Sequence, residues 1–112
     1  MNNPTSCQIN VKPDVVFHPD TWRTPEMWRI VFVVRVTAPY NYTPTITSGI
    51  EGRHCVGSFH YIGGALDWRI NDIATSYLGR WVSEITKKLG DDYRVKLGPV
   101  CIHIHWKGMP RP

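Results

Sequence analysis

Two short segments constrain this chain more than any other feature, because they carry the side chains best suited to bind a divalent metal. The first covers positions 58–67 and contains His60 and Asp67. The second, far along the chain, contains His103 and His105. A fold that unites the two segments brings four possible metal ligands together.

The spacing within each segment supports such a site. His60 and Asp67 flank Gly63-Gly64, a natural tight bend that can turn both side chains toward one point. On a strand, residues two apart share a face, so His103 and His105 point the same way. A catalytic zinc ion takes three protein ligands, commonly imidazole nitrogens and carboxylate oxygens, and leaves a fourth position open. One of the two later histidines can therefore bind the metal while the other acts on substrate or water.

With 112 residues, the chain has the length of one domain with a modest core. We expect a single domain over 1–112, with loose termini at 1–14 and 107–112. The cysteines at positions 7, 55 and 101 cannot all pair within one chain and form no CxxC motif, so we expect reduced thiols and synthesis in a cytoplasm. We expect no signal peptide, since the N-terminus has neither a basic start nor an apolar run.

The charge indicates the class of partner. A net charge of +4 and a pI near 9.2 favour an acidic or anionic partner, such as peptidoglycan, nucleic acid or phospholipid headgroups. Lys and Arg are scattered and form no basic stripe, so we expect no nucleic-acid binding. A zinc-stabilised nucleic-acid binder remains as a third hypothesis, which salt-sensitive DNA binding would reveal. No stretch approaches the roughly 20 apolar residues of a membrane span.

The patterning predicts an α+β fold with a small, mainly antiparallel sheet, helices packed on one face and the zinc site in a groove on the other. Thr24-Pro25-Glu26 is typical of a helix start, although the Val- and Ile-rich residues that follow also suit a strand. Residues 71–88 form the clearest helix, with apolar residues in steps of four and Asn71 as N-cap. Extended segments are expected at 43–48, 58–61, 65–70, 93–97 and 100–106, the last two as an antiparallel hairpin.

The pattern Ser58-x-His60-x-x-Gly63-x-Ala65-x-Asp67 resembles the first zinc motif of the M15 D-alanyl-D-alanine peptidases. The wider group includes the lysostaphin-type peptidases and the zinc-bearing signalling domain of hedgehog proteins. Residues 52–61, 89–95 and 103–105 are also similar to small phage M15-like proteins. The resemblance covers roughly residues 45–107.

Carried over position by position, the resemblance implies the zinc ligands His60, Asp67 and His105. His103 would then be the general base or would stabilise the tetrahedral intermediate, and His54 would steady the developing oxyanion. The other alignment, that of M15 members with a Glu-x-x-His closing motif, makes His103 the ligand and His105 its neighbour. Of the two, we favour His105 as the ligand.

The sequence departs from the M15 pattern at one functional position. M15 members place a catalytic Glu shortly before the final His, but residues 98–102 read Gly-Pro-Val-Cys-Ile and hold no carboxylate. Either an imidazole transfers the proton, as in the lysostaphin-type members, or the site binds zinc without turnover. A neutral imidazole near pH 7 is a competent base.

The expected function is that of a zinc-dependent peptidase that cleaves stem peptides or cross-links of bacterial peptidoglycan, in the manner of a phage endolysin. A phage or prophage product of this kind would be made without a signal peptide and would act at the bacterial cell wall after release by other means. The alternative is a catalytically inactive zinc-bearing binding module of the same fold.

Three further residues are candidates for binding substrate. Arg53 and Arg69 could hold a substrate carboxylate. Ser58 is expected to brace a ligand or the backbone and not to act as a nucleophile. Cys101 has the same strand parity as His103 and His105 and could reach the metal, but we expect it to be a buried small residue.

Overall fold

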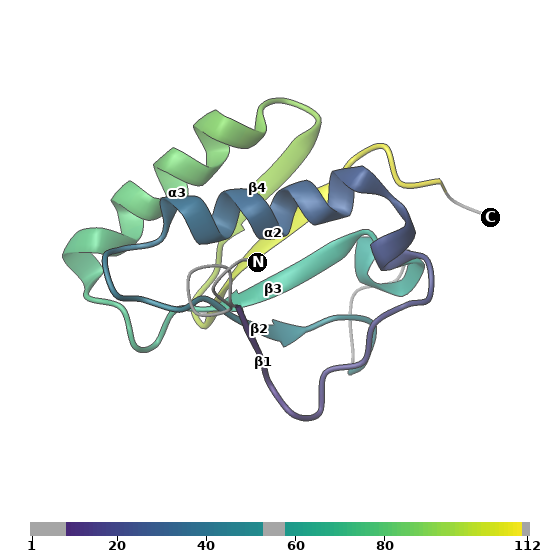
Figure 1. Ribbon diagram of the computed structural model, residues 1–112, viewed down its shortest axis with the longest axis horizontal. Coiled ribbons are helices and arrows are strands. Elements are labelled where there is room, and N and C mark those ends of the chain that lie inside the picture. The colour runs from purple at the N-terminus through teal and green to yellow at the C-terminus, as the bar shows by residue number, and fades with distance from the viewer. Residues whose placement is uncertain (1–8, 53–57, 111–112) are drawn as a thin grey trace, which may run out of the picture.

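The computed structural model describes residues 9–52 and 58–110, which form an α+β domain (Figure 1). Its elements are β1 (Asn10–Val11), the 3₁₀ turn η1 (Thr21–Arg23), α2 (Pro25–Thr37), β2 (Thr45–Ser48), the 3₁₀ turn η2 (Phe59–Ile62), β3 (Ala65–Arg69), α3 (Thr75–Leu89), β4 (Tyr93–Leu97) and β5 (Cys101–Trp106). The predicted fold class is therefore confirmed. In the described part of the chain, no helix is long and apolar enough to cross a membrane.

The sheet has the strand order β1-β2-β3-β5-β4. The short edge strand β1 runs parallel to β2, and the other neighbouring pairs are antiparallel. The predicted hairpin of β4 and β5 is present, and its turn is closed by the Gly98 N–H, which donates to the Cys101 carbonyl at 2.9 Å. The prediction of a mainly antiparallel sheet is therefore confirmed.

The alternation of side chains along β3 and β5 gives the sheet two different faces. One face carries the fully buried side chains of Leu66, Trp68, Ile102 and Ile104. The intervening residues point to the opposite face; they are Ala65, Asp67 and Arg69 on β3 and Cys101, His103 and His105 on β5. The candidate site residues Asp67, His103 and His105 therefore share the face away from the core.

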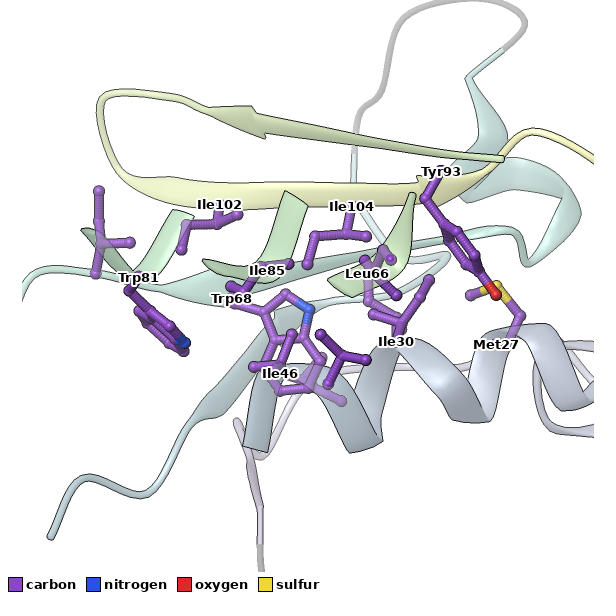
Figure 2. Packing of buried hydrophobic residues seen from close by; sticks show 14 residues of the cluster. Met27, Ile30, Ile46, Leu66, Trp68, Trp81, Ile85, Tyr93, Ile102 and Ile104 are labelled. Atoms are coloured by element: carbon purple, nitrogen blue, oxygen red, sulfur yellow. The ribbon is translucent and has the colours of Figure 1, made fainter. Parts of the chain in front are cut away.

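The two main helices cover the apolar face of the sheet. Figure 2 shows Met27 and Ile30 of α2 and Ile85 of α3 against the side chains of β3 and β5. In α3 the stripe predicted from steps of four is buried at Trp81, Ile85 and Leu89. The helix start predicted at Thr24-Pro25 is also confirmed, with Pro25 as the first helical residue.

The predicted start of the helix at 71–88 is wrong. The helix predicted from Asn71 begins at Thr75, because residues 70–73 form a turn in which the Ile73 N–H donates to the Ile70 carbonyl at 3.1 Å. The Asp72 carboxylate, expected in the first helical turn, instead accepts a hydrogen bond from the Tyr42 hydroxyl at 2.8 Å. Asp72 is therefore held by a tyrosine from a distant loop and does not lie in the first turn of α3.

The segment 58–61 is also not extended as predicted, since Phe59–Ile62 is a 3₁₀ turn. The C-terminal segment differs as well from the loose tail that was expected. Met109 is only 5% exposed, and the Lys107 N–H donates to the Asp92 carbonyl at 2.9 Å. The chain therefore stays packed at least as far as Met109.

A pair of substitutions in α2 tests this packing. Ile30→Ala should lower the free energy of unfolding by about 2–5 kcal/mol, because Ile30 is fully buried and its loss leaves a cavity. Val36→Ala in the same helix should change it by less than about 0.5 kcal/mol, because Val36 is 44% exposed. Urea unfolding measures both values, and equal costs would contradict the orientation of α2.

Candidate metal centre

His60 lies in η2, and the local sequence fixes its position. The Ser58 hydroxyl accepts a hydrogen bond from the His60 N–H at 3.1 Å, so Ser58 caps the turn. Gly63 ends the turn with a φ of 80°, and a Cβ there would lie 2.7 Å from the Cβ of His18. The motif serine and glycine thus shape a turn that leaves the His60 side chain only 3% exposed.

Strand pairing supplies the other two members of the cluster. Asp67 of β3 lies directly opposite His103 of β5 in the antiparallel register. Side chains opposite each other in such a pair lie on one face, with Cβ atoms about 4.5–5.5 Å apart. The pairing therefore brings two residues that are distant in sequence to one point beside His60.

The three side chains meet at nearly equal distances. His60 Nε2 lies 3.1 Å from Asp67 Oδ1 and 3.2 Å from His103 Nδ1. The distance from His103 Nδ1 to Asp67 Oδ1 is 3.1 Å. Three potential ligand atoms, two nitrogens and one oxygen, thus form a small triangle.

The hydrogen bonding of His60 shows why this triangle suits a cation. His60 Nδ1 lies 2.7 Å from the Gly49 carbonyl oxygen, which can only accept, so Nδ1 carries the proton. In the neutral ring Nε2 then bears a lone pair, and it faces Asp67 Oδ1 without a proton between them. Two acceptors, the His60 Nε2 and the Asp67 Oδ1, then face each other. A positive charge at the centre of the triangle would satisfy both, and so would a second proton on the His60 ring.

The triangle also has suitable dimensions for a metal. Zinc bonds of about 2.0–2.1 Å in a tetrahedral site place the ligand atoms about 3.3 Å apart. The observed separations of 3.1–3.2 Å agree with that value. The group of His60, Asp67 and His103 could therefore hold a metal ion.

The carboxyl of Asp67 is held in its charged form. Burial favours the neutral form, but the adjacent imidazoles of His103 and His60 outweigh this effect and lower the pKa of Asp67 to about 2. Asp67 is therefore ionised at any pH at which imidazoles are neutral, as a metal ligand must be.

His105 lies next to the triangle and is not a member of it. Its Nδ1 is 2.9 Å from His103 Nε2, and its ring stacks on Phe59 with 4.1 Å between ring centroids. Burial and the neighbouring His103 lower the pKa of His105 to about 4, so this imidazole is neutral near pH 7. The observed distances fit the alignment with His103 as ligand, and the favoured role of His105 as ligand stays a prediction.

A carboxylate behind the site supports His60 indirectly. Glu51 accepts hydrogen bonds from the N–H of Gly49 at 2.8 Å and of Val16 at 3.0 Å. Burial acts to raise the pKa of Glu51, but these N–H groups lower it below the ordinary value. Because Gly49 in turn accepts from His60, Glu51 helps to hold the imidazole and its tautomer.

The cluster lines a pocket of about 560 Å³. Its described lining is Ser58, Phe59, His60, Asp67, Arg94, Lys96, Gly98, Pro99, Cys101, His103 and His105. A second pocket adjoins it and shares Asp67, Pro99 and Cys101 with the first. Together they hollow the face of the sheet that the helices leave uncovered.

The other candidate residues divide into three groups. Ser58 and Cys101 line the pocket. Ser58 holds the His60 backbone through its hydroxyl. Cys101 is a half-buried thiol, and burial is the main cause that raises its pKa to about 11. Arg69 lines only the adjoining pocket, so its role in substrate binding stays a prediction. Arg53 and His54 lie outside the described residues.

Sequence reasoning missed four residues at this centre. Arg94 and Lys96 of β4 lie opposite His105 and His103 in the hairpin register, a placement that strand parity and the turn length could have suggested. Gly49 and Glu51 approach His60 through loop geometry, for which the sequence carries no periodic signal. The comparisons give no further guidance, since no family model, curated protein or solved structure matches the chain.

Alanine substitutions distinguish the two alignments of the later histidines. His103→Ala should abolish stoichiometric zinc binding, because it removes one of three ligands. His105→Ala should retain the metal with an affinity about 10–100-fold lower, as is usual when a hydrogen-bond partner of a ligand is lost. Dialysis against buffered zinc followed by elemental analysis measures both, and the reverse result would identify His105 as the ligand.

Glu51 provides a second test, without touching a ligand. Glu51→Ala should weaken zinc binding about tenfold, because Gly49 loses the acceptor that fixes its carbonyl beside His60. Glu51→Gln should restore most of the affinity, since an amide oxygen can accept the same two hydrogen bonds. Competition with a chromogenic chelator measures the affinities, and equal binding by all three proteins would show that Glu51 has no such role.

Proposed function

We propose that this protein is a zinc-dependent metallopeptidase that hydrolyses peptide bonds of bacterial peptidoglycan. The observation that carries the proposal is the triangle of His60, Asp67 and His103 with 3.1–3.2 Å sides, which faces an open pocket. Two imidazoles and one carboxylate are a common ligand set of catalytic zinc sites in hydrolases.

The choice of zinc follows from the chemistry of the ligands. The site combines two nitrogens with one oxygen, whereas magnesium and calcium prefer oxygen ligands alone. A bound zinc ion supplies a Lewis acid that polarises the scissile carbonyl and lowers the pKa of water to about 7. The protein contributes the positions of the ligands and of the groups around them.

His105 acts on the substrate in this arrangement. With His103 Nδ1 used as ligand, its Nε2 carries a proton and donates to His105 Nδ1 at 2.9 Å. The neutral His105 ring then has its own proton on Nε2, which suits it to donate to negative charge that develops on the substrate carbonyl oxygen. His105 thus takes the stabilising role that the resemblance implied for His103.

The substrate class follows from the resemblance and from charge. The motif at 58–67 is similar to that of peptidases that cleave D-alanyl peptides of the cell wall. The net charge of +4 suits the anionic wall. A pocket on an otherwise uncovered sheet face can accept an extended peptide strand.

A zinc-bearing binding module of the same fold is the second candidate, and one observation favours it. Among the described residues that line the pocket, Asp67 is the only carboxylate, and it belongs to the ligand set. His105 Nδ1 is occupied by His103, so neither group is free to accept a proton from water. His54 lies outside the described residues, so its predicted catalytic role stays a prediction.

Digestion of purified sacculi tests the proposal. The zinc-loaded protein should release soluble muropeptides, a chelator should stop the release, and added zinc should restore it. His103→Ala should release none, whereas Arg80→Gln, on the helical layer, should act as the unaltered protein does.

The opposite outcome is equally informative. If the protein is folded and carries one zinc ion but releases nothing, the peptidase proposal is wrong. Zinc-dependent sedimentation with sacculi, without release, would then support the binding module.

A further inference from the structure

We infer that Arg94 and Lys96 of β4 form a carboxylate-binding subsite beside the metal centre. The ligand it fits is a peptide with a carboxylate within two residues of the scissile amide. This inference rests on the proposed function, because the peptide bound at the metal presents the carboxylate to the two cations.

The register of the hairpin places both cations next to the site. Arg94 lies opposite His105, and Lys96 lies opposite His103. Directly opposed side chains share a face of the sheet, so the two cations project on the same side as the imidazoles. Both also line the pocket that contains the triangle.

Among the described residues, the two cations have no partner that neutralises them. Within residues 9–52 and 58–110, no ion pair or side-chain hydrogen bond engages Arg94 or Lys96. Some other cations among the described residues are engaged. Arg23 pairs with Asp20, Arg29 donates to the Lys88 carbonyl, and Lys107 donates to the Asp91 carbonyl.

The charge balance of the pocket favours an anionic ligand. Its one described carboxylate, Asp67, is already held between His60 and His103. A divalent metal would add two positive charges to the single negative charge of Asp67. With Arg94 and Lys96, the lining then carries a positive excess that a substrate carboxylate would reduce.

Strand geometry sets the distance from the metal to the subsite. Neighbouring strands lie about 4.8 Å apart, and residues two apart on one strand are separated by about 6.8 Å. An extended peptide advances about 3.3–3.6 Å per residue. A carboxylate one or two residues from the bond held at the metal therefore falls within reach of both cations, of which the Arg94 guanidinium can bind it through two hydrogen bonds.

Cations in this position can also serve two roles that involve no carboxylate. Charged side chains on an edge strand such as β4 hinder pairing with another chain, and that role requires no ligand. Nucleic-acid binding requires an extended basic surface, whereas here two cations flank one pocket. Of these three roles for Arg94 and Lys96, only a carboxylate subsite predicts discrimination between a peptide acid and the matching amide.

The test compares two probes with the zinc-loaded full chain. The probes are N-acetyl-D-Ala-N-methyl-D-Ala as the free acid and as its C-terminal amide, since N-methylation protects the bond between the two residues from hydrolysis. Calorimetry at low salt should show that the acid binds about tenfold more tightly than the amide, because only the acid forms charge-assisted hydrogen bonds.

Two double variants assign the preference to the subsite. Arg94→Gln with Lys96→Gln should bring the affinity ratio close to one while bound zinc stays unchanged. The matched control, Arg80→Gln with Lys87→Gln on α3, should keep the ratio of the unaltered protein. Zinc content confirms that each variant is folded at the site.

Three results would overturn the inference. The first is equal binding of acid and amide by the unaltered protein. The second is an equal loss of affinity for both probes in the β4 variant. The third is a β4 variant that keeps the acid-to-amide ratio but binds a short DNA duplex more weakly than the unaltered protein does. Release from sacculi separates the two proposals. Release with a ratio near one contradicts the subsite alone, and a tenfold ratio without release contradicts the peptidase activity alone.

Discussion

The antiparallel pairing of β3 with β5 is the interaction on which the rest of the structure depends. It sets Asp67 opposite His103 on one face and Trp68 opposite Ile102 on the other. A slip of one residue would turn the imidazoles into the core and the isoleucines into solvent. Burial of large apolar side chains, at about 1.5–3 kcal/mol each, opposes that slip. The hydrophobic core therefore fixes the strand register that brings the candidate metal ligands Asp67 and His103 together.

His60 reaches the same point by a different route, because it lies on a 3₁₀ turn and not on the sheet. Its position depends on hydrogen bonds to Ser58 and Gly49 and on a glycine at position 63, where a Cβ would collide with His18. A buried imidazole whose lone pair faces a carboxylate is costly without a cation. Metal binding and folding are therefore expected to stabilise each other in this domain.

The two later histidines have different environments, and this difference matters for the proposed chemistry. His103 contacts His60 and Asp67, whereas His105 is held between His103 and the ring of Phe59. With His103 as ligand, a chain of hydrogen bonds fixes which nitrogen of each ring carries a proton. That chain favours a hydrogen-bond donor role for His105. A peptidase also needs a group that accepts a proton from water, whereas a binding module does not, so this step separates the two candidate functions.

The sequence alone determined the parts of the fold that depend on local patterns. Alternation predicted β4 and β5, the Thr24-Pro25 signal predicted the start of α2, and steps of four predicted the buried stripe of α3. The spacing of His60 and Asp67 around the glycine bend also indicated half of the site. Tertiary structure decided the rest, because it depends on contacts between distant segments. Strand register made His103 the neighbour of Asp67 and placed Arg94 and Lys96 at the pocket. The Tyr42 hydroxyl donates to Asp72, which lies before α3 and not in the helix that was predicted there.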